Sequence, residues 1–387
     1  MTKLTGRDLP VDVEPQILRW LLDSSGWTEP EIGRKLKVGP GTVENWLDGR
    51  GKLSLAQVEA LSGWLKRPLA AFFLPAPPKE RPAPRDYRML PGKTGIFSKK
   101  TLLAMRRARR MQTISRELMI NLEMKTAAIS KAASITDDPE SIAPSVRENL
   151  GISVDAQKGW KNVYEAFTAW REAINVNNIM VFQMPMPLED ARGFSLVDDE
   201  PFVIIVNSSD TPEARIFTLL HEYGHILLKE AGICFPNNVS KAGYERQTIE
   251  RWCNEFAAAV LLPKAQLEKD LEGLRKQDYL GRECLVAISR RYKVSKSALL
   301  LFLAKNRYIS WADHDSAVER AKQATKARKK GFAAMPAEKK VLQERGKKYI
   351  TLVAKNVRGG NISKIDAMEY LSVKLPNLEK VMAYAER

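Results

Sequence analysis

The stretch Phe217-Thr-Leu-Leu-His-Glu-Tyr-Gly-His-Ile-Leu-Leu228 contains His221-Glu222-x-x-His225 in an apolar setting, and it uses two of the three histidines of the chain. Residues four apart lie on one face of a helix, so both imidazoles can reach a single metal ion. Glu222 then lies beside that ion and can act as a general base. The pattern predicts a metal site on a helix over about 212–230. The alternative is a buried amphipathic helix whose histidines are satisfied by hydrogen bonds.

Two histidines leave a catalytic zinc site one protein ligand short, because such sites use three and keep a fourth position for water. We expect the third ligand on the next helix, which spans about 245–262 and ends before Pro263. Glu250 is our candidate, with Asn254 beside it on the same face as a supporting residue. Other candidate ligands are Glu245, Glu255 and His314. The apolar stripe of this helix consists of Ile249, Trp252, Cys253, Phe256 and Val260.

Length and composition indicate a globular chain of two or three domains, with 387 residues and a hydrophobic content of 44%. No apolar run is long enough for a membrane span, and the N-terminus shows no secretion signal. Cys234, Cys253 and Cys284 show no CxxC spacing, so we expect reduced thiols in the cytoplasm. The formal charge of +16 favours polyanionic partners, nucleic acid first, although a merely soluble basic surface is the alternative.

Residues 1–76 are expected to form short helices. The helices fall at Pro15–Ser24, Glu29–Leu36, Pro40–Leu47 and Ser54–Leu65. A tight turn at 37–39 between the second and third is typical of a helix-turn-helix domain.

The third of these helices is poorly equipped to read DNA, because Gly39, Pro40 and Gly41 carry no base-reading groups. The DNA-contacting candidates are Thr42 and Asn45 for base edges and Arg50 and Lys52 for phosphates. Glu44 would repel a phosphate. Dimerisation or substrate capture are alternative roles for this domain.

The remaining chain falls into four predicted regions: a proline-rich linker over 77–96, a basic helical region over 97–177, a core over 178–310 and a basic helical C-terminal region over 311–387. The basic region should contain long helices over 98–131 and 154–175. Short strands are expected at 178–183, 193–197 and 202–206, the last as an edge strand beside the metal site. Gly359-Gly360 should break the C-terminal helices.

Basic segments in 98–131 and 318–348 could bind nucleic acid, with Lys326-Ala-Arg-Lys-Lys330 as the best patch, although such runs are more usually solvated helix faces. The fold class expected from all these elements is mainly α with a small β-sheet (α+β).

Several ordered segments together resemble the ImmA/IrrE metallopeptidase family in its long form, which begins with an XRE-type helix-turn-helix domain. The segments are Leu18-Arg19-Trp20, residues 55–61, 67–75, Asp86-Tyr87-Arg88, Gly193-Phe194, Phe217–His225, Glu250–Ala257 and the tail from Gly359 to Lys374. The resemblance implies a zincin-like fold with His221, His225 and Glu250 as zinc ligands and Glu222 as the catalytic residue. It also implies inactivation of a partner repressor, or a place in a toxin–antitoxin-like operon.

The sequence therefore predicts a cytoplasmic zinc endopeptidase fused to a helix-turn-helix domain, which acts in transcription, stress, mobile-element or phage response. Its expected substrate is a protein, such as a repressor or antitoxin encoded nearby, and a homodimer and DNA binding remain open. A second hypothesis is a DNA-binding regulator, or toxin–antitoxin component, whose metal site is structural or sensory. A third is a peptidase fold that acts by stoichiometric protein contact without cleavage.

Overall fold

A computed structural model describes residues 9–79, 97–124, 133–228, 239–273, 276–325 and 335–384 of the chain. The chain divides into two compact units. Unit 1 contains residues 1–85 and 90–107, and unit 2 contains residues 86–89 and 108–387. The boundary falls inside helix α5 (Lys99–Asn121), whose first nine residues belong to unit 1.

Unit 1 is a group of short helices around an apolar core. Its elements are β1 (Pro10–Val11), α1 (Pro15–Asp23), α2 (Glu29–Leu36), α3 (Thr42–Leu47), β2 (Leu53–Ser54), α4 (Leu55–Leu65) and the 3-10 helix η1 (Leu69–Phe73). The four expected helices are present. Lys37 ends α2 in the left-handed conformation, and Gly41, also left-handed, delays the start of α3 by two residues. Whether this unit is a helix-turn-helix DNA reader stays a prediction.

Unit 2 is built on a three-stranded sheet of β3 (Ile179–Met184), β4 (Gly193–Leu196) and β5 (Phe202–Asn207). The strand order is β3-β5-β4, with β3 parallel and β4 antiparallel to β5. The prediction of residues 202–206 as an edge strand was therefore wrong. Its continuous apolar run suits a central strand that is buried on both faces. The edge strand of this hairpin is β4.

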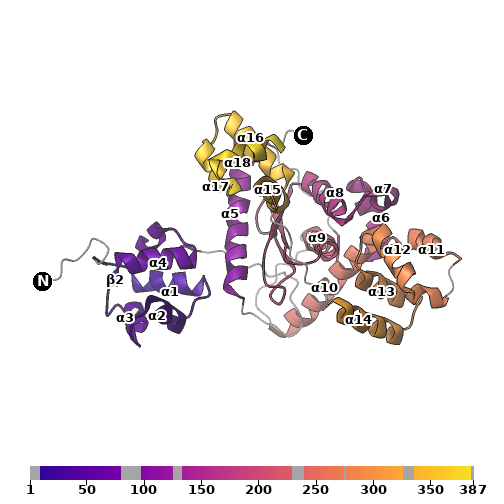
Figure 1. The fold of residues 1–387 in the computed structure, drawn as a ribbon, viewed down its shortest axis with the longest axis horizontal. Helices are drawn as coiled ribbons and strands as arrows, with labels where there is room; N and C mark the ends of the chain where they lie inside the picture. The colour runs from indigo at the N-terminus through magenta and orange to yellow at the C-terminus, as the bar shows by residue number, and fades with distance from the viewer. Residues whose placement is uncertain are drawn as a thin grey trace. The chain divides into compact units, whose positions relative to one another are not determined.

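Both faces of the sheet are covered (Figure 1). On one face, residues of β3 and β5 share a core with α8 (Val163–Val176) and α9 (Pro212–Leu227). On the other face, Phe182 of β3 meets the Tyr349 ring of α16 (Lys347–Arg358) edge-on, with centroids 5.2 Å apart. Burial on both sides holds α9, which carries the histidines, against a rigid support.

The other elements of unit 2 are helical. They are α6 (Pro139–Asn149), α7 (Val154–Gly159), α10 (Val239–Leu261), α11 (Lys264–Leu271), the 3-10 helix η3 (Lys276–Leu280), α12 (Arg282–Tyr292), α13 (Lys296–Lys305), α14 (Trp311–Thr325), α15 (Ala337–Arg345), α17 (Lys364–Leu371) and α18 (Leu375–Tyr384). The expected fold class, mainly α with a small β-sheet, is confirmed. The expected break at Gly359-Gly360 is confirmed as well.

Two long helices of the basic region were predicted incorrectly. The helix expected over 154–175 is split into α7 and α8, because Trp160 is extended and the Asn162 side chain caps α8. The helix expected over 98–131 ends at Asn121, close to Glu123 in the left-handed conformation. Most of the proline-rich linker, its residues 80–96, and the 326–330 patch lie outside the described residues.

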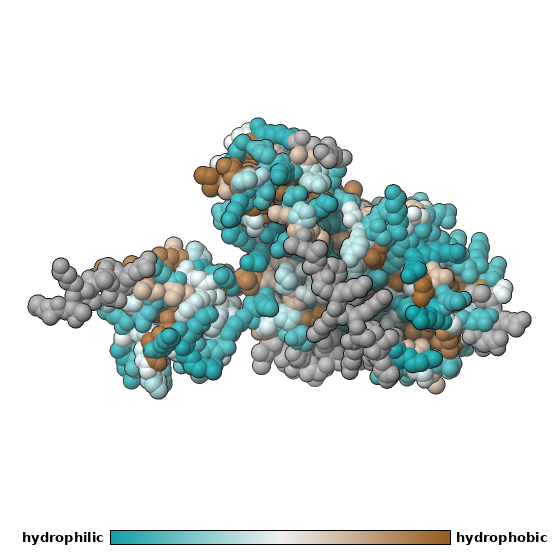
Figure 2. Space-filling view, viewed as in Figure 1, coloured by the Kyte–Doolittle hydropathy of each residue, from teal (hydrophilic) through white to brown (hydrophobic). Residues whose placement is uncertain are grey.

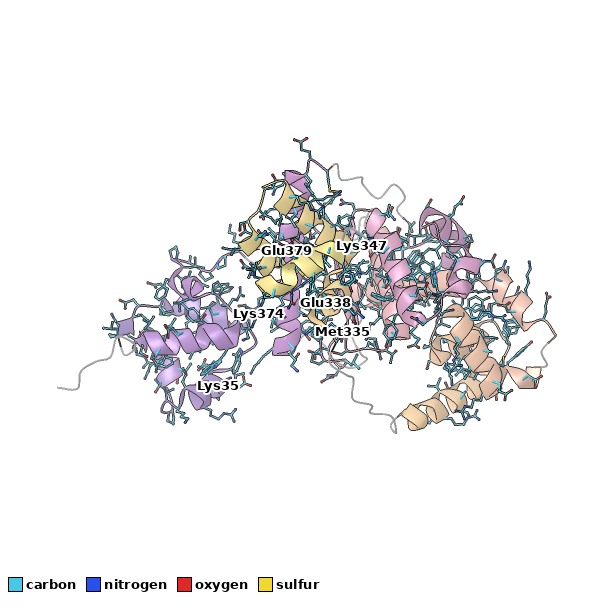
Figure 3. The ribbon with its side chains drawn as sticks, turned by 45° about the horizontal axis from the view of Figure 1, so that its top comes forward. Lys35, Met335, Glu338, Lys347, Lys374 and Glu379 are labelled. Atoms are coloured by element: carbon cyan, nitrogen blue, oxygen red, sulfur yellow. The ribbon has the colours of Figure 1, made fainter. Side chains whose placement is uncertain are left out.

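The surface of the C-terminal helices mixes charges of both signs. Glu338, Lys347, Lys374 and Glu379 lie there together (Figure 3). Apolar side chains also reach the surface of this part of the protein (Figure 2). Ile365 and Leu375 are exposed. None of the helices within the described residues combines the length and apolar character needed to cross a bilayer.

We predict that Gly346→Ala destabilises unit 2. Gly346 has φ +79°, and a Cβ there would lie 2.5 Å from the guanidinium of Arg171. That buried guanidinium donates to the Val181 carbonyl of β3 and to the Gln343 carbonyl at the end of α15. The strain alone is worth about 1–3 kcal/mol, so thermal unfolding should shift to lower temperature. Gly359→Ala, at an ordinary helical φ of −72°, is the control and should be tolerated.

Candidate metal centre

Helix α9 presents its polar residues along one buried face. Thr211 caps the helix by accepting a hydrogen bond from the Ala214 amide, and Pro212 occupies the first turn. His221, Glu222 and His225 are all buried, although burying such groups is costly unless they are paired or bind a metal. Their position inside the core therefore indicates a function beyond packing.

Gly224 allows α10 to pack closely on this face of α9. A Cβ at Gly224 would lie 3.1 Å from the Phe256 ring and 3.3 Å from Cys253 Sγ, so the absent side chain makes room for α10. The nearest neighbours of this glycine are therefore side chains of α10. The stacked rings of Trp252 and Phe256, with centroids 5.3 Å apart, fill the contact.

This packing brings three ligand-type side chains together. His221 Nε2 and His225 Nε2 lie 3.2 Å apart. Glu250 Oε2 lies 3.3 Å from His221 Nε2, and Glu250 Oε1 lies 3.4 Å from His225 Nε2. Among the described residues, His221, His225 and Glu250 form the group of side chains that could hold a metal ion.

The spacing fits a first-row metal ion. Tetrahedral ligands at ~2.0 Å, the usual zinc–nitrogen and zinc–oxygen distance, lie about 3.3 Å from one another. The three separations of 3.2, 3.3 and 3.4 Å match one face of such a tetrahedron. Two imidazoles and one carboxylate suit zinc and its neighbours better than calcium or magnesium, which prefer oxygen.

Charges around the cluster shift the pKa values of its members. Burial alone would lower the pKa of His225, but the contact with Cys253, the hydrogen bond to Glu250 and the charge of Glu222 outweigh it. The His225 pKa therefore lies well above 6.5. Burial alone would raise the pKa of Glu250, but His221 and His225 hold it well below its usual range. The metal-free cluster thus keeps a proton that a metal ion must displace.

Glu222 lies where α9 meets the edge strand β4. A Cβ at Gly193 of β4 would lie 3.5 Å from Glu222 Oε1, 2.5 Å from the Thr218 methyl group and 2.8 Å from the Ile205 carbonyl oxygen. Only glycine fits there without displacing β4. The Thr218 hydroxyl, one helical turn before Glu222, is buried and finds no hydrogen-bond partner among the described residues.

Several other predicted site residues lie apart from the cluster. Asn254 is half-buried and makes no hydrogen bond to Glu250 among the described residues. Glu255 pairs with Lys305 at 3.0 Å, and His314 pairs with its neighbour Asp315 at 2.9 Å. The Glu245 side chain lies outside the described part of the structure. Tyr223 is buried against Phe256 in the core.

Two contributors were missed by sequence reasoning. Cys253 was assigned to the packed stripe, and it is fully buried, but its thiol also contacts His225. Its spacing of three residues from Glu250 was a usable signal, since i and i+3 share a helix face. Gly193 was noted only within a family resemblance. Nothing local in the sequence says that this glycine faces Glu222.

In unit 1, the residues proposed to contact DNA are exposed or half-buried around α3. Arg50 forms an ion pair with Asp48 at 2.6 Å, and Lys52 forms one with Asp12 at 2.6 Å. These surface pairs are weak, yet they place carboxylates beside the proposed phosphate contacts.

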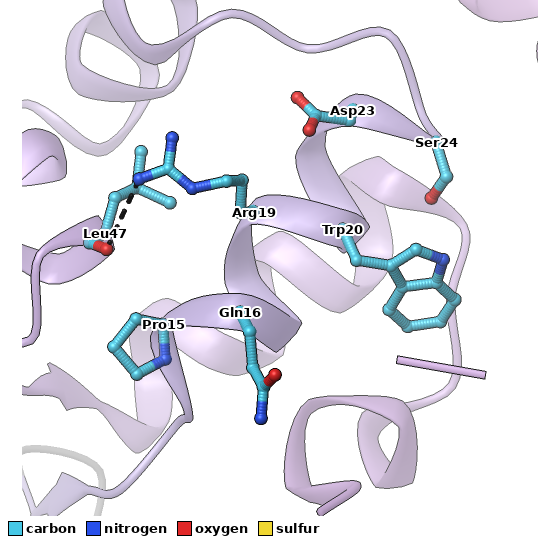
Figure 4. Close-up of a pocket in the computed structure, with 7 residues that line it drawn as sticks. All are labelled: Pro15, Gln16, Arg19, Trp20, Asp23, Ser24 and Leu47. Atoms are coloured by element: carbon cyan, nitrogen blue, oxygen red, sulfur yellow. Dashed lines mark hydrogen bonds between the residues drawn. The ribbon is translucent and has the colours of Figure 1, made fainter. Parts of the chain in front are cut away.

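Unit 1 also has an open pocket of about 600 Å³ along α1 (Figure 4). It is lined by Pro15, Gln16, Arg19, Trp20, Asp23, Ser24 and Leu47.

Comparison with known proteins agrees with the metal cluster. Residues 175–304 match the Peptidase M78 family, described as the IrrE N-terminal-like domain. The match covers 130 of the 387 residues. The two histidines, Glu222 and Glu250 all fall within it.

Two proteins from Deinococcus species are also similar to this chain. The "Radiation response metalloprotease IrrE" of Deinococcus radiodurans is 36% identical over 110 residues, which cover 28% of this chain and 32% of the relative. The protein of the same name from Deinococcus deserti is 36% identical over 132 residues, covering 34% and 44% respectively. The chain thus spans about a third to less than half of the length of these relatives. The rest of each chain lies outside the match.

We predict that Glu250→Ala abolishes tight metal binding. The change removes one of three ligands and leaves two histidines that cannot complete the site. Metal content measured by atomic emission after dialysis should fall from one ion per chain to a small fraction. Glu255→Ala, on the same helix but paired with Lys305, should keep full occupancy. Full occupancy in Glu250→Ala would move the third ligand elsewhere.

We also predict that stabilisation by zinc increases with pH. The pKa of His225 is higher in the folded protein than in the unfolded chain, so its protonation stabilises the metal-free fold. This stabilisation is fully present below about pH 6.5, the ordinary histidine pKa. It is lost as the pH rises through the pKa of His225 in the folded protein. Zinc needs the neutral imidazole. The rise in melting temperature on adding zinc should therefore be larger at about pH 8 than at about pH 6. An equal or smaller rise at the higher pH would contradict this assignment, and magnesium serves as the control cation.

Proposed function

We propose that this protein is a zinc-dependent endopeptidase whose zinc is held by His221, His225 and Glu250. The observation that carries the proposal is the mutual spacing of 3.2–3.4 Å among the three ligand atoms, with the Glu222 carboxylate buried beside them. The metalloprotease-like match over residues 175–304 supports the same reaction class.

The proposed reaction is hydrolysis of a peptide bond, and the protein residues divide its tasks. When bound, zinc supplies Lewis acidity, which lowers the pKa of a water molecule and polarises the substrate carbonyl. Glu222 accepts a proton from the attacking water and later delivers one to the nitrogen of the leaving amine. Because Glu222 is fully buried, bulk water does not screen its charge.

The substrate is proposed to bind as an extended peptide along β4. Among the described strands, β4 pairs only with β5, so the backbone groups of its other edge can accept a peptide strand. Gly193 places this edge directly beside Glu222. All four residues of β4 are buried, so a substrate reaches the edge only when surrounding elements move apart. That requirement suits a regulated peptidase better than a degradative one.

The biological substrate is proposed to be a DNA-binding repressor or an antitoxin encoded nearby, with cleavage relieving repression. The resemblance of the chain to the ImmA/IrrE family supports this role, and both relatives are named radiation response metalloproteases. Unit 1 would recruit the substrate or the promoter. The ion pairs of Arg50 and Lys52 favour recruitment of protein over independent reading of DNA.

We predict that Glu222→Gln keeps zinc and loses cleavage. The amide fills the same space but cannot accept the proton, and general base catalysis is worth about 10²–10⁴-fold. Zinc-loaded wild type and variant should be incubated with purified repressors encoded beside the gene, and the products identified by intact mass. Glu213→Gln, in the first turn of the same helix, is the matched control and should cleave like wild type.

The same experiment separates the alternative functions. If Glu222→Gln relieves repression in cells as well as wild type does, the protein acts by binding and is not a protease in that role. If zinc removal abolishes the effect while Glu222→Gln preserves it, the site is structural or sensory.

A further inference from the structure

Three side chains of α5 hold the loop that joins β4 to β5. Arg109, Gln112 and Arg116 lie on one face of the helix, at spacings of three and four residues. All three reach residues 198–201, which form the turn of the hairpin. One face of α5 therefore contacts a single short loop through three side chains.

Three of these contacts go to the loop backbone. Gln112 Nε2 donates to the Asp199 carbonyl at 2.7 Å and to the Pro201 carbonyl at 3.1 Å. Arg116 Nε donates to the Glu200 carbonyl at 2.8 Å. Gln112 is only 3% exposed, so its amide is desolvated, and losing these partners would leave a buried polar group unsatisfied. The loop is thus held by its main chain at consecutive residues.

Ion pairs add to these hydrogen bonds between α5 and the loop. Arg109 pairs with Asp198, and Arg116 pairs with Asp199. The Gln112 side-chain oxygen accepts from Arg109 at 3.3 Å, which links the charged and neutral contacts in one network. The arginines on this face of α5 are therefore matched to the acidic loop, which argues against this face as a nucleic-acid surface.

The held hairpin leads directly to the candidate catalytic carboxylate. The register pairs Leu196 with Val203 and Gly193 with Val206, so β4 moves together with its loop and with β5. At its far end, Gly193 fits against Thr218 and Glu222 with no space for a Cβ. A shift of the loop would change the distance between the β4 edge and the Glu222 carboxylate.

We propose that Arg109, Gln112 and Arg116 are positioning residues of the candidate active site. They fix the β4–β5 hairpin so that the proposed substrate edge at Gly193 stays at a constant distance from the Glu222 carboxylate. None of them touches the metal ligands, so they act on the geometry of the edge and the base, not on metal affinity. The proposal deepens the proposed peptidase function and rests on it.

The test compares Gln112→Ala and Arg109→Ala/Arg116→Ala with Arg110→Ala. Arg110 lies on the same helix but pairs with Glu369 of α17, so its variant loses an α5 ion pair without touching the hairpin. Hydrogen exchange at residues 193–207 should become faster by about tenfold in the hairpin variants. Residues 212–227 should stay protected, and zinc content should stay full in all three.

A functional readout that needs no substrate is the affinity of the zinc-loaded protein for acetohydroxamate. This small chelator binds zinc and gives its proton to a nearby carboxylate. Glu222→Gln, which lacks that carboxylate, therefore shows how weak the binding of acetohydroxamate becomes when the proton acceptor is lost. The hairpin variants should lose affinity by about tenfold, because a looser β4 no longer holds the Glu222 side chain in place; this is less than the ~10²-fold cost of a full 1 Å misplacement. Arg110→Ala should match wild type. With a cleaved substrate, kcat should fall by about the same factor while KM changes less.

The outcomes distinguish this proposal from the peptidase function. Unchanged exchange at 193–207 in the hairpin variants would overturn the positioning role. If hydrogen exchange becomes faster but the affinity for acetohydroxamate stays at the wild-type value, the proposal is also overturned. The contacts of α5 with the hairpin would then serve stability alone. Absence of cleavage by wild type, with acetohydroxamate affinity still lost in the hairpin variants, would refute the peptidase function and keep the positioning role.

Discussion

The close contact between α9 and α10 at Gly224 is the constraint on which the candidate metal centre depends. Two histidines on one helix can reach a common ion, but the third ligand belongs to another helix. That helix brings Glu250 within 3.4 Å of both imidazoles because the side chains of Phe256 and Cys253 occupy the space beside Gly224. The apolar stripe of α10 supplies the packing energy that holds these charged groups in the core. The hydrophobic effect therefore stabilises a site that would be unfavourable on electrostatic grounds alone.

The sheet contributes the second half of the site. A central strand buried on both faces fixes the edge strand β4 through a continuous antiparallel register. A glycine at the start of β4 lets this edge come close to α9, where any side chain would push the two apart. The candidate metal ligands and the proposed substrate edge are thus positioned by different contacts. Metal affinity and the alignment of Glu222 with a substrate can therefore change independently.

The metal ligands could be predicted from the sequence because the relevant rules are local. The i and i+4 spacing of His221 and His225 requires only that the segment be helical. Glu250 could be proposed because an amphipathic stripe fixes which face of α10 is buried. The role of Cys253 was overlooked because its apolar neighbours explained its burial well enough.

Features that depend on long-range topology could not be predicted in this way. The run Phe202–Val206 was predicted as an edge strand, and only its pairing with β3 as well as with β4 shows that it is the central strand. The break between α7 and α8 was missed for another reason, because its signal, the N-cap Asn162, is local but was not recognised. The acidic partners of Arg109 and Arg116, Asp198 and Asp199, lie 89 and 83 residues further along the chain, so the sequence showed the charge of these arginines without showing what neutralises it.

X-ray absorption spectroscopy at the zinc edge of the metal-loaded protein tests the central claim most directly. Two imidazoles and one carboxylate predict one zinc per chain, with nitrogen and oxygen scatterers at ~2.0 Å and the imidazole outer-shell pattern. Cys253 contacts His225 without being a ligand in this arrangement. A sulfur scatterer at ~2.3 Å, or a spectrum without imidazole features, would contradict it.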